Sequence, residues 1–582
     1  MQSIDVDSFI SDSTTLPCTC HGSPFRDEHH DHIITGNLEI VADAKLRKLI
    51  SKGPKYREPV QFSCNNAKTE ILKGIDRCIE TWSNKAGLSI AAFADWKNNI
   101  ILKMDDRISS LANNRSTFTT SILKDANVNK CLADLQNNYV MVPIDKASNN
   151  VAFICKRYYA TVILKELGLV GSSTSTYTKI ENQSPDEIIN LHKVALKDRF
   201  KLKVEDSMST LPDIYWTPKL HKNPIKSRFI IASKKCTVKH LSKNISSIFC
   251  LFNKQIEIYN KKASYYSGIN AYWIVQNRDP VLEAVKKSVR NKSAKCVSSF
   301  DFSTLYTKIP HDKLIDVLKK IIDFVFKGGT RKKIAIDRYG TAHWAGNKTT
   351  SSILFTKESV IEAVSFLIKN CYFKFGDKLF RQDIGIPMGS DPAPFFANLF
   401  LYYYESSWLK SIKKTNNHIA RKFGKVFRYI DDLLALNDGN FFESYHHQIY
   451  PSELQLNKEN EANTETNFLD LHINIDNGVF TTKLYDKRDN FGFDITRLPY
   501  RNSNIPCRMF YSSIAAECLR ICRATSSDRQ AIASIKSLLT RMDKQGADKF
   551  KMKNYITKSF NRHEINHKFG IVDNSFINRI FL

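Results

Sequence analysis

The chain has no long apolar run and no internal repeat. Its most apolar stretch, Phe395 to Leu401, is interrupted by Asn398 and followed by Glu405. A membrane-spanning helix needs roughly 18 or more consecutive apolar residues, so we expect no membrane anchor. No period of about 20 to 50 residues recurs, which argues against solenoids and repeat arrays.

The cysteines also lack the pattern of a disulfide-bonded protein. The 13 cysteines are an odd number spread over the whole length, and none of them form a CxxC pair. No apolar segment with a cleavage site stands at the N-terminus. Secreted disulfide scaffolds have the opposite features, so we expect an intracellular protein with reduced thiols.

Acidic residues are scarce relative to basic ones. Lys and Arg number 86 against 59 Asp and Glu, which gives a formal net charge of +27 over 582 residues. A polyanionic partner is the simplest cause. A merely soluble basic protein, or one drawn to acidic membranes, has the same composition. The 42% hydrophobic content is ample for about two to four packed units.

Three regions differ in character. Residues 1–130 begin with a polar segment rich in Cys and His and continue with helical patterns at Ala44–Ile50 and Ala91–Leu111. In residues 131–500 short β-prone runs alternate with helices, which is typical of an α+β domain. Residues 501–582 return to helical periodicity and are basic. We expect a helical N-terminal extension, an α+β central region and a helical C-terminal region.

Three carboxylates interrupt β-prone runs in the central region. Asp301 ends the run Cys296–Phe302, and Asp431 and Asp432 stand in the middle of Val426–Leu436. Adjacent charges between apolar strands are costly unless something stabilises them. A hairpin with the Asp pair at its tip, next to Asp301, would hold two Mg²⁺ ions about 3.5–4 Å apart for phosphoryl transfer. The alternative is that the pair is a plain turn and Asp301 a helix N-cap.

Two further patterns lie between the carboxylates. Phe373–Phe380 predicts a hairpin with a Gly-Asp turn. Gly385–Pro394 is a glycine-containing turn before a helix, and Gly389 lies within it. Glycine lets a backbone approach a base pair or a phosphate closely. Alternatively, this turn is an ordinary helix start.

The order of these motifs resembles that of reverse transcriptases, in detail those of the Penelope-like retroelement branch. The segments that resemble motifs A, B and C and the part after motif D are Asp301–Tyr306, Gly385–Ser390, Tyr429–Asp432 and Asn467–Asp470. Branch-specific features are the Tyr306–His311 continuation and Met388-Gly389. Fingers-like and primer-grip-like segments are Pro143–Lys146, Tyr215–Lys222, Lys226–Ile230 and Lys483–Arg488. The resemblance covers roughly residues 15 to 540, and six motifs in the right order are highly specific.

The resemblance implies a right-hand polymerase with an α+β fold. Fingers and palm would occupy residues 131–500, and residues 501–582 would form a basic helical thumb. The implied activity is RNA-templated DNA synthesis with two Mg²⁺ ions, or Mn²⁺ in their place. The implied partners are an RNA template, a DNA primer and dNTPs, with no membrane, and a chromosomal target implies residence in the nucleus.

The resemblance also implies roles for single residues. Asp301, Asp431 and Asp432 would be the metal ligands. Tyr306 falls where an aromatic ring blocks the 2′-hydroxyl of the incoming nucleotide, whereas RNA-dependent RNA polymerases place an acid there. Lys458 lies in the region resembling motif D, whose lysine is a general acid toward pyrophosphate. The alternatives are a half-buried Tyr306 and a surface Lys458.

A basic cluster accompanies the fingers-like segments. On a fingers hairpin it would clamp the triphosphate, and Arg suits bidentate contacts. Its members are Lys219, Lys222, Lys226 and Arg228, with Arg228 the first candidate and Lys226 the second. Lys146 is a further fingers candidate. The alternative is a solvated loop.

Two features stand apart from the polymerase. Zn²⁺ ligands are available at Cys18, Cys20, His21, His29, His30 and His32, but their spacing matches no standard finger, so we favour a plain polar tail over zinc. No paired GIY-YIG nuclease motif follows Pro499, so we expect no nuclease.

Two other functions remain open. One is an RNA-dependent RNA polymerase, which the aromatic Tyr306 disfavours. The other is a catalytically silent nucleic-acid-binding descendant, which the three intact carboxylates disfavour.

Overall fold

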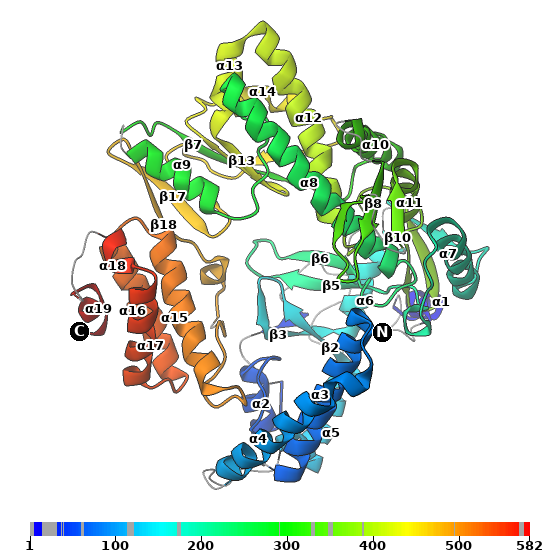
Figure 1. The fold of residues 1–582 in the computed structure, drawn as a ribbon, viewed down its shortest axis with the longest axis vertical. Coiled ribbons are helices and arrows are strands. Elements are labelled where there is room, and N and C mark those ends of the chain that lie inside the picture. Colours follow the sequence, from blue (N-terminus) through cyan, green and yellow to red (C-terminus); the bar gives the residue numbers. More distant parts are fainter. Residues whose placement is uncertain are drawn as a thin grey trace.

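Helices and antiparallel sheets alternate along the chain in this computed structural model (Figure 1). The structure describes residues 5–13, 32–35, 38, 40–59, 63–112, 121–171, 176–289, 292–327, 332–346, 353–386, 389–493, 495–569 and 575–582. Among these residues, no helix is long and apolar enough to cross a membrane.

A four-stranded antiparallel sheet lies at the centre of the largest core. Its strand order is β13-β14-β7-β15. The strands are β7 (Val297–Phe302), β13 (Val426–Tyr429), β14 (Asp432–Leu436) and β15 (Leu456–Lys458). Side chains alternate between the two faces of a strand, and β14 shows the consequence. Leu433 and Ala435 enter the core formed with the helices, whereas Leu434 and Leu436 enter a second core.

Long helices cover the first face of this sheet. Their apolar residues join Phe300 and Phe302 of β7 in one core. These helices are α8 (Lys239–Ser267), α10 (His311–Lys327), α11 (Lys357–Lys369), α12 (Ala393–Thr415) and α14 (Phe441–Ile449), with the short α13 (Asn417–Lys422) between the last two. The second core lies on the opposite face, where α9 (Asp279–Val289) and a three-stranded sheet cover it. That sheet consists of β16 (Glu465–Phe468), β17 (Leu471–Asp476) and β18 (Val479–Leu484).

Smaller sheets come from the parts of the chain before β7 and between β7 and β13. One has the order β1-β3-β2, with β1 (Ile33–Ile34), β2 (Tyr139–Ile144) and β3 (Ala147–Cys155). Next to it is the hairpin of β5 (Ile214–Lys219) and β6 (Lys226–Ile231). Two further sheets are β11-β12-β4 (Tyr372–Phe375, Lys378–Gln382, Tyr177–Ile180) and β10-β8-β9 (Ile353–Thr356, Lys333–Ile336, Ala342–Trp344). Helices α6 (Lys156–Glu166) and α7 (Pro185–Phe200) accompany these sheets.

The two ends of the chain are helical. The N-terminal helices are α1 (Val6–Ser13), α2 (Ala44–Ser51), α3 (Cys64–Ala86), α4 (Ala94–Ala112) and α5 (Ala126–Asn138). The C-terminal helices are α15 (Cys507–Ala524), α16 (Asp528–Lys544), α17 (Lys549–Arg562), α18 (Ile565–Lys568) and α19 (Ser575–Phe581), which share a core of their own. Ile514, Cys518 and Cys522 recur every four residues in α15, and this spacing builds its buried face.

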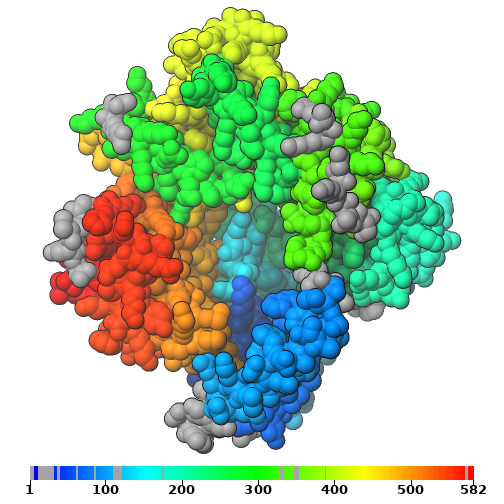
Figure 2. Space-filling model, in the orientation of Figure 1, coloured from blue at the N-terminus to red at the C-terminus, as the bar shows by residue number. Residues whose placement is uncertain are grey.

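The segment after α2 contacts the segment that leads into the C-terminal helices. The backbone N–H of Arg57 donates to Ser503 Oγ at 3.0 Å, and Asn504 donates to the Arg57 carbonyl at 2.8 Å. On its other side, an added Cβ at Gly53 would lie 1.8 Å from the Asn149 carbonyl oxygen in β3. Figure 1 shows the elements arranged around the middle of the molecule, and Figure 2 shows that this face is hollowed there.

Several expectations differ from the structure in detail. The boundary expected at residue 130 falls inside α5, and β1 extends the sheet of β2 and β3 from the N-terminal side. The zinc candidates Cys18, Cys20, His21, His29 and His30 lie outside the residues that the structure describes. His32 is described: it is fully buried, with its ring stacked 4.5 Å from that of Tyr158.

The Gly385 backbone is expected to tolerate no side chain. Gly385 has φ +96°, and an added Cβ would lie 2.2 Å from the Tyr306 carbonyl oxygen. We expect Gly385→Ala to lower the free energy of unfolding by roughly 2–4 kcal/mol. Gly74 lies inside α3 with no atom near its added Cβ. Gly74→Ala should therefore raise stability by about 0.5–1 kcal/mol. Denaturant unfolding of both variants tests this, and an unchanged Gly385→Ala stability would contradict it.

Candidate active site

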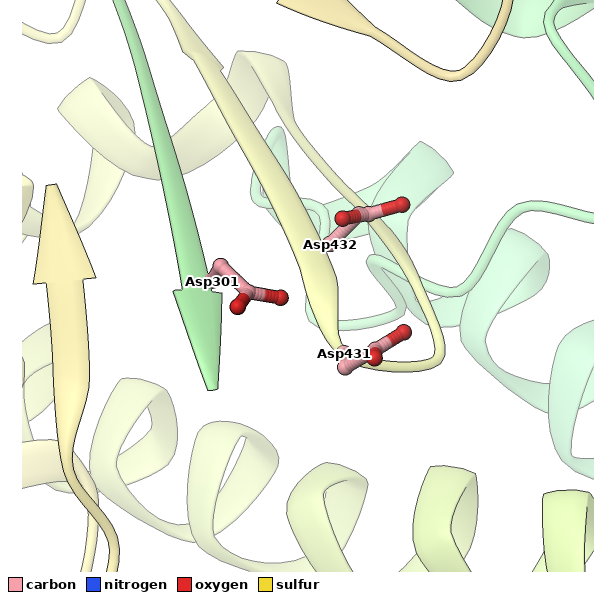
Figure 3. A group of neighbouring side chains, drawn as sticks. All are labelled: Asp301, Asp431 and Asp432. Atoms are coloured by element: carbon pink, nitrogen blue, oxygen red, sulfur yellow. The ribbon is translucent and has the colours of Figure 1, made fainter. Parts of the chain in front are cut away.

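Asp301, Asp431 and Asp432 converge at one end of the central sheet. Asp301, one residue before the end of β7, lies directly opposite Asp432, the first residue of β14, so both side chains lie on the same face. Asp431 precedes Asp432 in the turn from β13. The three half-buried residues each offer a ligand oxygen, and these atoms all lie within 4.8 Å of one another. Figure 3 shows the carboxylate of Asp301 pointing toward the strand that carries Asp432.

A strained turn places Asp431 beside the other two. Tyr429 pairs with Asp432, which leaves Ile430 and Asp431 as the turn between β13 and β14. Ile430 has φ +57°. A β-branched residue in this left-handed region is a true outlier, because its Cβ crowds the backbone, and such strain is typical of functional sites.

The site holds more negative charge than its surroundings offset. Burial first, and then the charge of Asp431, raise the pKa of Asp301 to about 6 and that of Asp432 to about 7. Lys487 lowers both pKa values and Lys222 lowers that of Asp301, but neither reverses the shift. Clustered carboxylate oxygens with uncompensated charge are the donor set that Mg²⁺ prefers. These residues therefore fit a divalent metal.

A cavity of about 490 Å³ lies beside the carboxylates. Its lining includes Asp432, Glu459, Lys222, Lys487 and Tyr485. Glu459 donates its backbone N–H to the Ser299 carbonyl at 2.9 Å, which continues the pairing of β15 with β7, and its charge raises the pKa of Asp301. Sequence reasoning missed Glu459 and the position of Lys487. The alternation through Asn457 and Glu459 would have indicated the former, had β15 been recognised as a strand.

Tyr306 lies close to the carboxylates. Burial raises the pKa of its hydroxyl, and the charge of Asp431 raises that pKa further. Its backbone carbonyl accepts a hydrogen bond from Ile386 N at 3.1 Å. This bond fastens the segment after β7 to the glycine-containing turn.

Basic side chains gather on one face of the β5–β6 hairpin. Lys219 lies opposite Lys226, and Thr217 lies opposite Arg228, so the three basic residues share a face. Arg228 Nη1 lies 3.1 Å from Asp145 Oδ1 in the β2–β3 turn. The charge of Arg228 lowers the pKa of Tyr306, and the charge of Asp431 raises it. Tyr306 therefore lies near both the basic face and the carboxylates. Lys146, the other fingers candidate, is exposed in the same turn as Asp145, with φ +63°.

Gly389 has a close neighbour within the protein. It has φ +85°, and an added Cβ would lie 2.1 Å from the carbonyl oxygen of Ile231, the last residue of β6. Ser233 Oγ also donates a hydrogen bond to the Gly389 carbonyl. The glycine thus lets its turn pack against β6, while its contact with a nucleotide stays a prediction.

The structure corrects the expectation for Lys458. This residue lies opposite Phe300 in the pairing of β15 with β7, one position away from Asp301. Because side chains alternate, Lys458 lies on the sheet face opposite the carboxylates. There its Nζ lies 2.7 Å from Glu443 Oε2 of α14. This geometry does not suit a general acid acting at the carboxylates.

Comparison with known proteins finds likeness in structure only. No protein-family model matches the chain, and no curated protein matches it. A structure of telomerase from Candida albicans in complex with a TWJ fragment of telomeric RNA matches with TM-score 0.51 and 12% identity, covering 99% of this chain and 94% of that chain. Apo telomerase from Candida tropicalis matches with TM-score 0.41 and 11% identity, covering 92% and 83% of the two chains.

The match to the Candida albicans telomerase indicates the class of fold. The chain has a mixed helix-and-sheet fold that resembles that of telomerase, a right-hand polymerase fold. The predicted α+β polymerase fold is confirmed at this level, while its division into fingers, palm and thumb stays a prediction. Neither neighbour is a Penelope-like protein, so that narrower resemblance rests on the sequence motifs alone.

Removing one of the clustered charges should stabilise the metal-free protein. The pKa of Asp432 is raised to about 7 in the folded state, so folded protein holds this proton more tightly than unfolded chain, where the pKa is about 3.9. The cost of ionisation therefore grows as pH rises from about 4 to about 7. Asp432→Asn avoids this cost, and we expect it to raise the midpoint of thermal unfolding at pH 8 more than at pH 5.

Asp476 at the exposed end of β17 supplies the matched control. Asp476→Asn should leave the unfolding midpoint nearly unchanged at both pH values. A lower midpoint for Asp432→Asn than for the wild type at pH 8 would contradict the charge crowding.

Proposed function

We propose that the chain is an RNA-templated DNA polymerase, the reverse transcriptase of a Penelope-like retroelement. The observation that carries the proposal is the convergence of Asp301, Asp431 and Asp432 within 4.8 Å. Its setting supports the same function, because the carboxylates stand in a fold resembling that of telomerase and next to a basic hairpin.

The three carboxylates would hold two Mg²⁺ ions, or Mn²⁺ in their place. When bound, such ions activate the primer 3′-hydroxyl and stabilise the charge on the leaving pyrophosphate. Asp301 and Asp432 face each other across paired strands, and Asp431 reaches the same space from the turn. Their fixed backbone positions would align the primer end with the nucleotide, which is where most of the rate gain in such transfers arises.

The basic face of the β5–β6 hairpin would bind the triphosphate. Arg228 is the first candidate, with Lys226 and Lys219 beside it on the same face. In the structure its guanidinium pairs with Asp145, and its charge lowers the pKa of Tyr306. A triphosphate offers more charge than that single carboxylate and would compete for the same fork of donors.

The nucleic acid partners would be an RNA template and a DNA primer. The chain carries a formal net charge of +27, and phosphate contacts supply most of the affinity for nucleic acid. The structurally similar Candida albicans telomerase is bound to a fragment of telomeric RNA. The hollow in Figure 2 would take the primer–template duplex.

Extension of a DNA primer annealed to an RNA template tests the proposal. With Mg²⁺ and dNTPs, the wild-type chain should extend the primer, and Asp431→Asn should lower the rate on the order of 10³-fold. Asp476→Asn serves as the matched Asp-to-Asn control and should extend normally. Binding of the duplex without any extension by the wild type would contradict the proposal, and extension with rNTPs alone would indicate an RNA polymerase.

Tyr306 is expected to select deoxynucleotides. If its ring excludes the 2′-hydroxyl, Tyr306→Ala should raise incorporation of rNTPs relative to dNTPs by about 10- to 100-fold. The measurement is single-nucleotide kcat/KM for matched rNTP and dNTP pairs. Tyr339→Ala, at a tyrosine with 64% exposure, is the control. An unchanged ratio in Tyr306→Ala would contradict this role.

A further inference from the structure

A fully buried ion pair lies beneath the turn that carries Asp431. Arg428 of β13 and Glu405 of α12 are both 0% exposed. Arg428 Nε donates to Glu405 Oε1 at 2.6 Å, and Nη2 donates to Glu405 Oε2 at 3.0 Å. This two-point geometry fixes the plane of the guanidinium as well as its position.

A second residue of α12 completes the socket for the guanidinium. Arg428 Nη1 donates to Asn398 Oδ1 at 2.8 Å, and Nη2 donates to the Asn398 carbonyl at 3.0 Å. Asn398 and Glu405 are separated by two helical turns and so share one face of α12. Both interrupt the apolar and aromatic sequence of the first half of α12. Both of them accept hydrogen bonds from Arg428.

The remaining contact of the guanidinium reaches the catalytic turn. Arg428 Nη1 also donates to the carbonyl oxygen of Ile430 at 3.1 Å. With this bond, all five N–H donors of the side chain have an acceptor. Ile430 is the residue in the left-handed conformation, and its carbonyl belongs to the peptide group that leads into Asp431. The hydrogen bond from Arg428 to this carbonyl fixes the orientation of the peptide group, and so the position of Asp431.

The backbone of Arg428 is anchored independently. Its N–H donates to the Trp273 carbonyl at 2.7 Å, and Val275 N donates to the Arg428 carbonyl at 2.8 Å. Trp273 is fully buried. Through its backbone and its guanidinium together, Arg428 therefore joins three parts of the structure, namely the segment of Trp273, α12 and the strained turn.

We propose that Arg428 is a positioning residue that aims Asp431 and Asp432 through the Ile430 carbonyl, with Glu405 and Asn398 holding the guanidinium in place. The proposal rests on the polymerase function proposed above. A stabilising role alone explains less, because buried ion pairs can often be replaced by apolar pairs of similar size without loss of stability. An apolar pair, however, leaves the Ile430 carbonyl without its donor.

The decisive variant is the double substitution Arg428→Met with Glu405→Leu. It removes both buried charges together and roughly keeps the volume, so the fold should survive. The polar groups of Asn398 and Tyr450 lose their partners, so the unfolding midpoint should fall. Arg428→Lys is the second variant, because lysine keeps the charge beside Glu405 but lacks the fork of donors. Tyr450→Phe is the matched control. It removes the hydrogen bond of 2.9 Å from Tyr450 to Glu405 and leaves the contact with Ile430 intact.

Two readouts separate positioning from stability. The first is the rate of primer extension over a Mg²⁺ titration, and the second is Mn²⁺ binding to the protein alone by electron paramagnetic resonance. For both Arg428 variants we expect a rate about 10- to 100-fold lower. The half-saturating Mg²⁺ concentration should rise and Mn²⁺ should bind more weakly, while duplex affinity and circular dichroism stay as in the wild type. Tyr450→Phe should match the wild type throughout.

Each outcome decides the proposal. Wild-type Mg²⁺ dependence and rate in a folded double variant would overturn it, as would an equal effect of Tyr450→Phe. If the double variant fails to fold, the same comparison with Arg428→Lys decides. If the wild type does not extend primers, the polymerase function fails separately, and the Mn²⁺ affinities alone decide whether Arg428 positions the carboxylates.

Discussion

Three like charges held at the half-buried end of two paired strands are the constraint on which the rest of the structure depends. Asp301, Asp431 and Asp432 repel one another, and burial penalises the ionised forms of Asp301 and Asp432. A chain selected only for stability would not place them there. The neighbouring structure makes the placement possible, because β7 and β14 pair in a register that sets Asp301 opposite Asp432, and the buried Arg428 contacts the strained turn.

Segments far apart in the sequence meet around these carboxylates through backbone contacts. The Tyr306 carbonyl accepts from Ile386, and Gly389 packs against the Ile231 carbonyl at the end of the β5–β6 hairpin. Arg228 on that hairpin pairs with Asp145 of the β2–β3 turn. Backbone contacts thus link the segment after Asp301 with the glycine-containing turn, and that turn with the hairpin whose basic face would bind the triphosphate.

Local patterns predicted much of this site. A hairpin with Asp431 and Asp432 at its tip, next to Asp301, was expected, and β13, β14 and β7 have this arrangement. Within a continuous strand or helix, the spacing of apolar residues follows the period of the element, so its buried face can be predicted from the sequence. Pattern reasoning also identified the basic cluster that shares one hairpin face.

Relations between distant segments were harder to predict. Lys458 was expected near the acids because of its motif, but the alternation of β15 turns it to the opposite face. Glu405 and Asn398 had only seemed to break an apolar run, because their partner Arg428 lies in another element. The strand β1, paired with β3, had no local signal beyond two isoleucines. In each case the deciding fact is a tertiary contact, which no periodicity encodes.

A crystal structure of the chain with a chain-terminated DNA primer on an RNA template, an incoming dNTP and Mn²⁺ tests the central claim most directly. Anomalous scattering locates Mn²⁺ independently of the polymer. We predict two ions coordinated by oxygens of Asp301, Asp431 and Asp432, between the primer end and the triphosphate. A bound duplex and nucleotide with no metal at these carboxylates would contradict the role assigned to them.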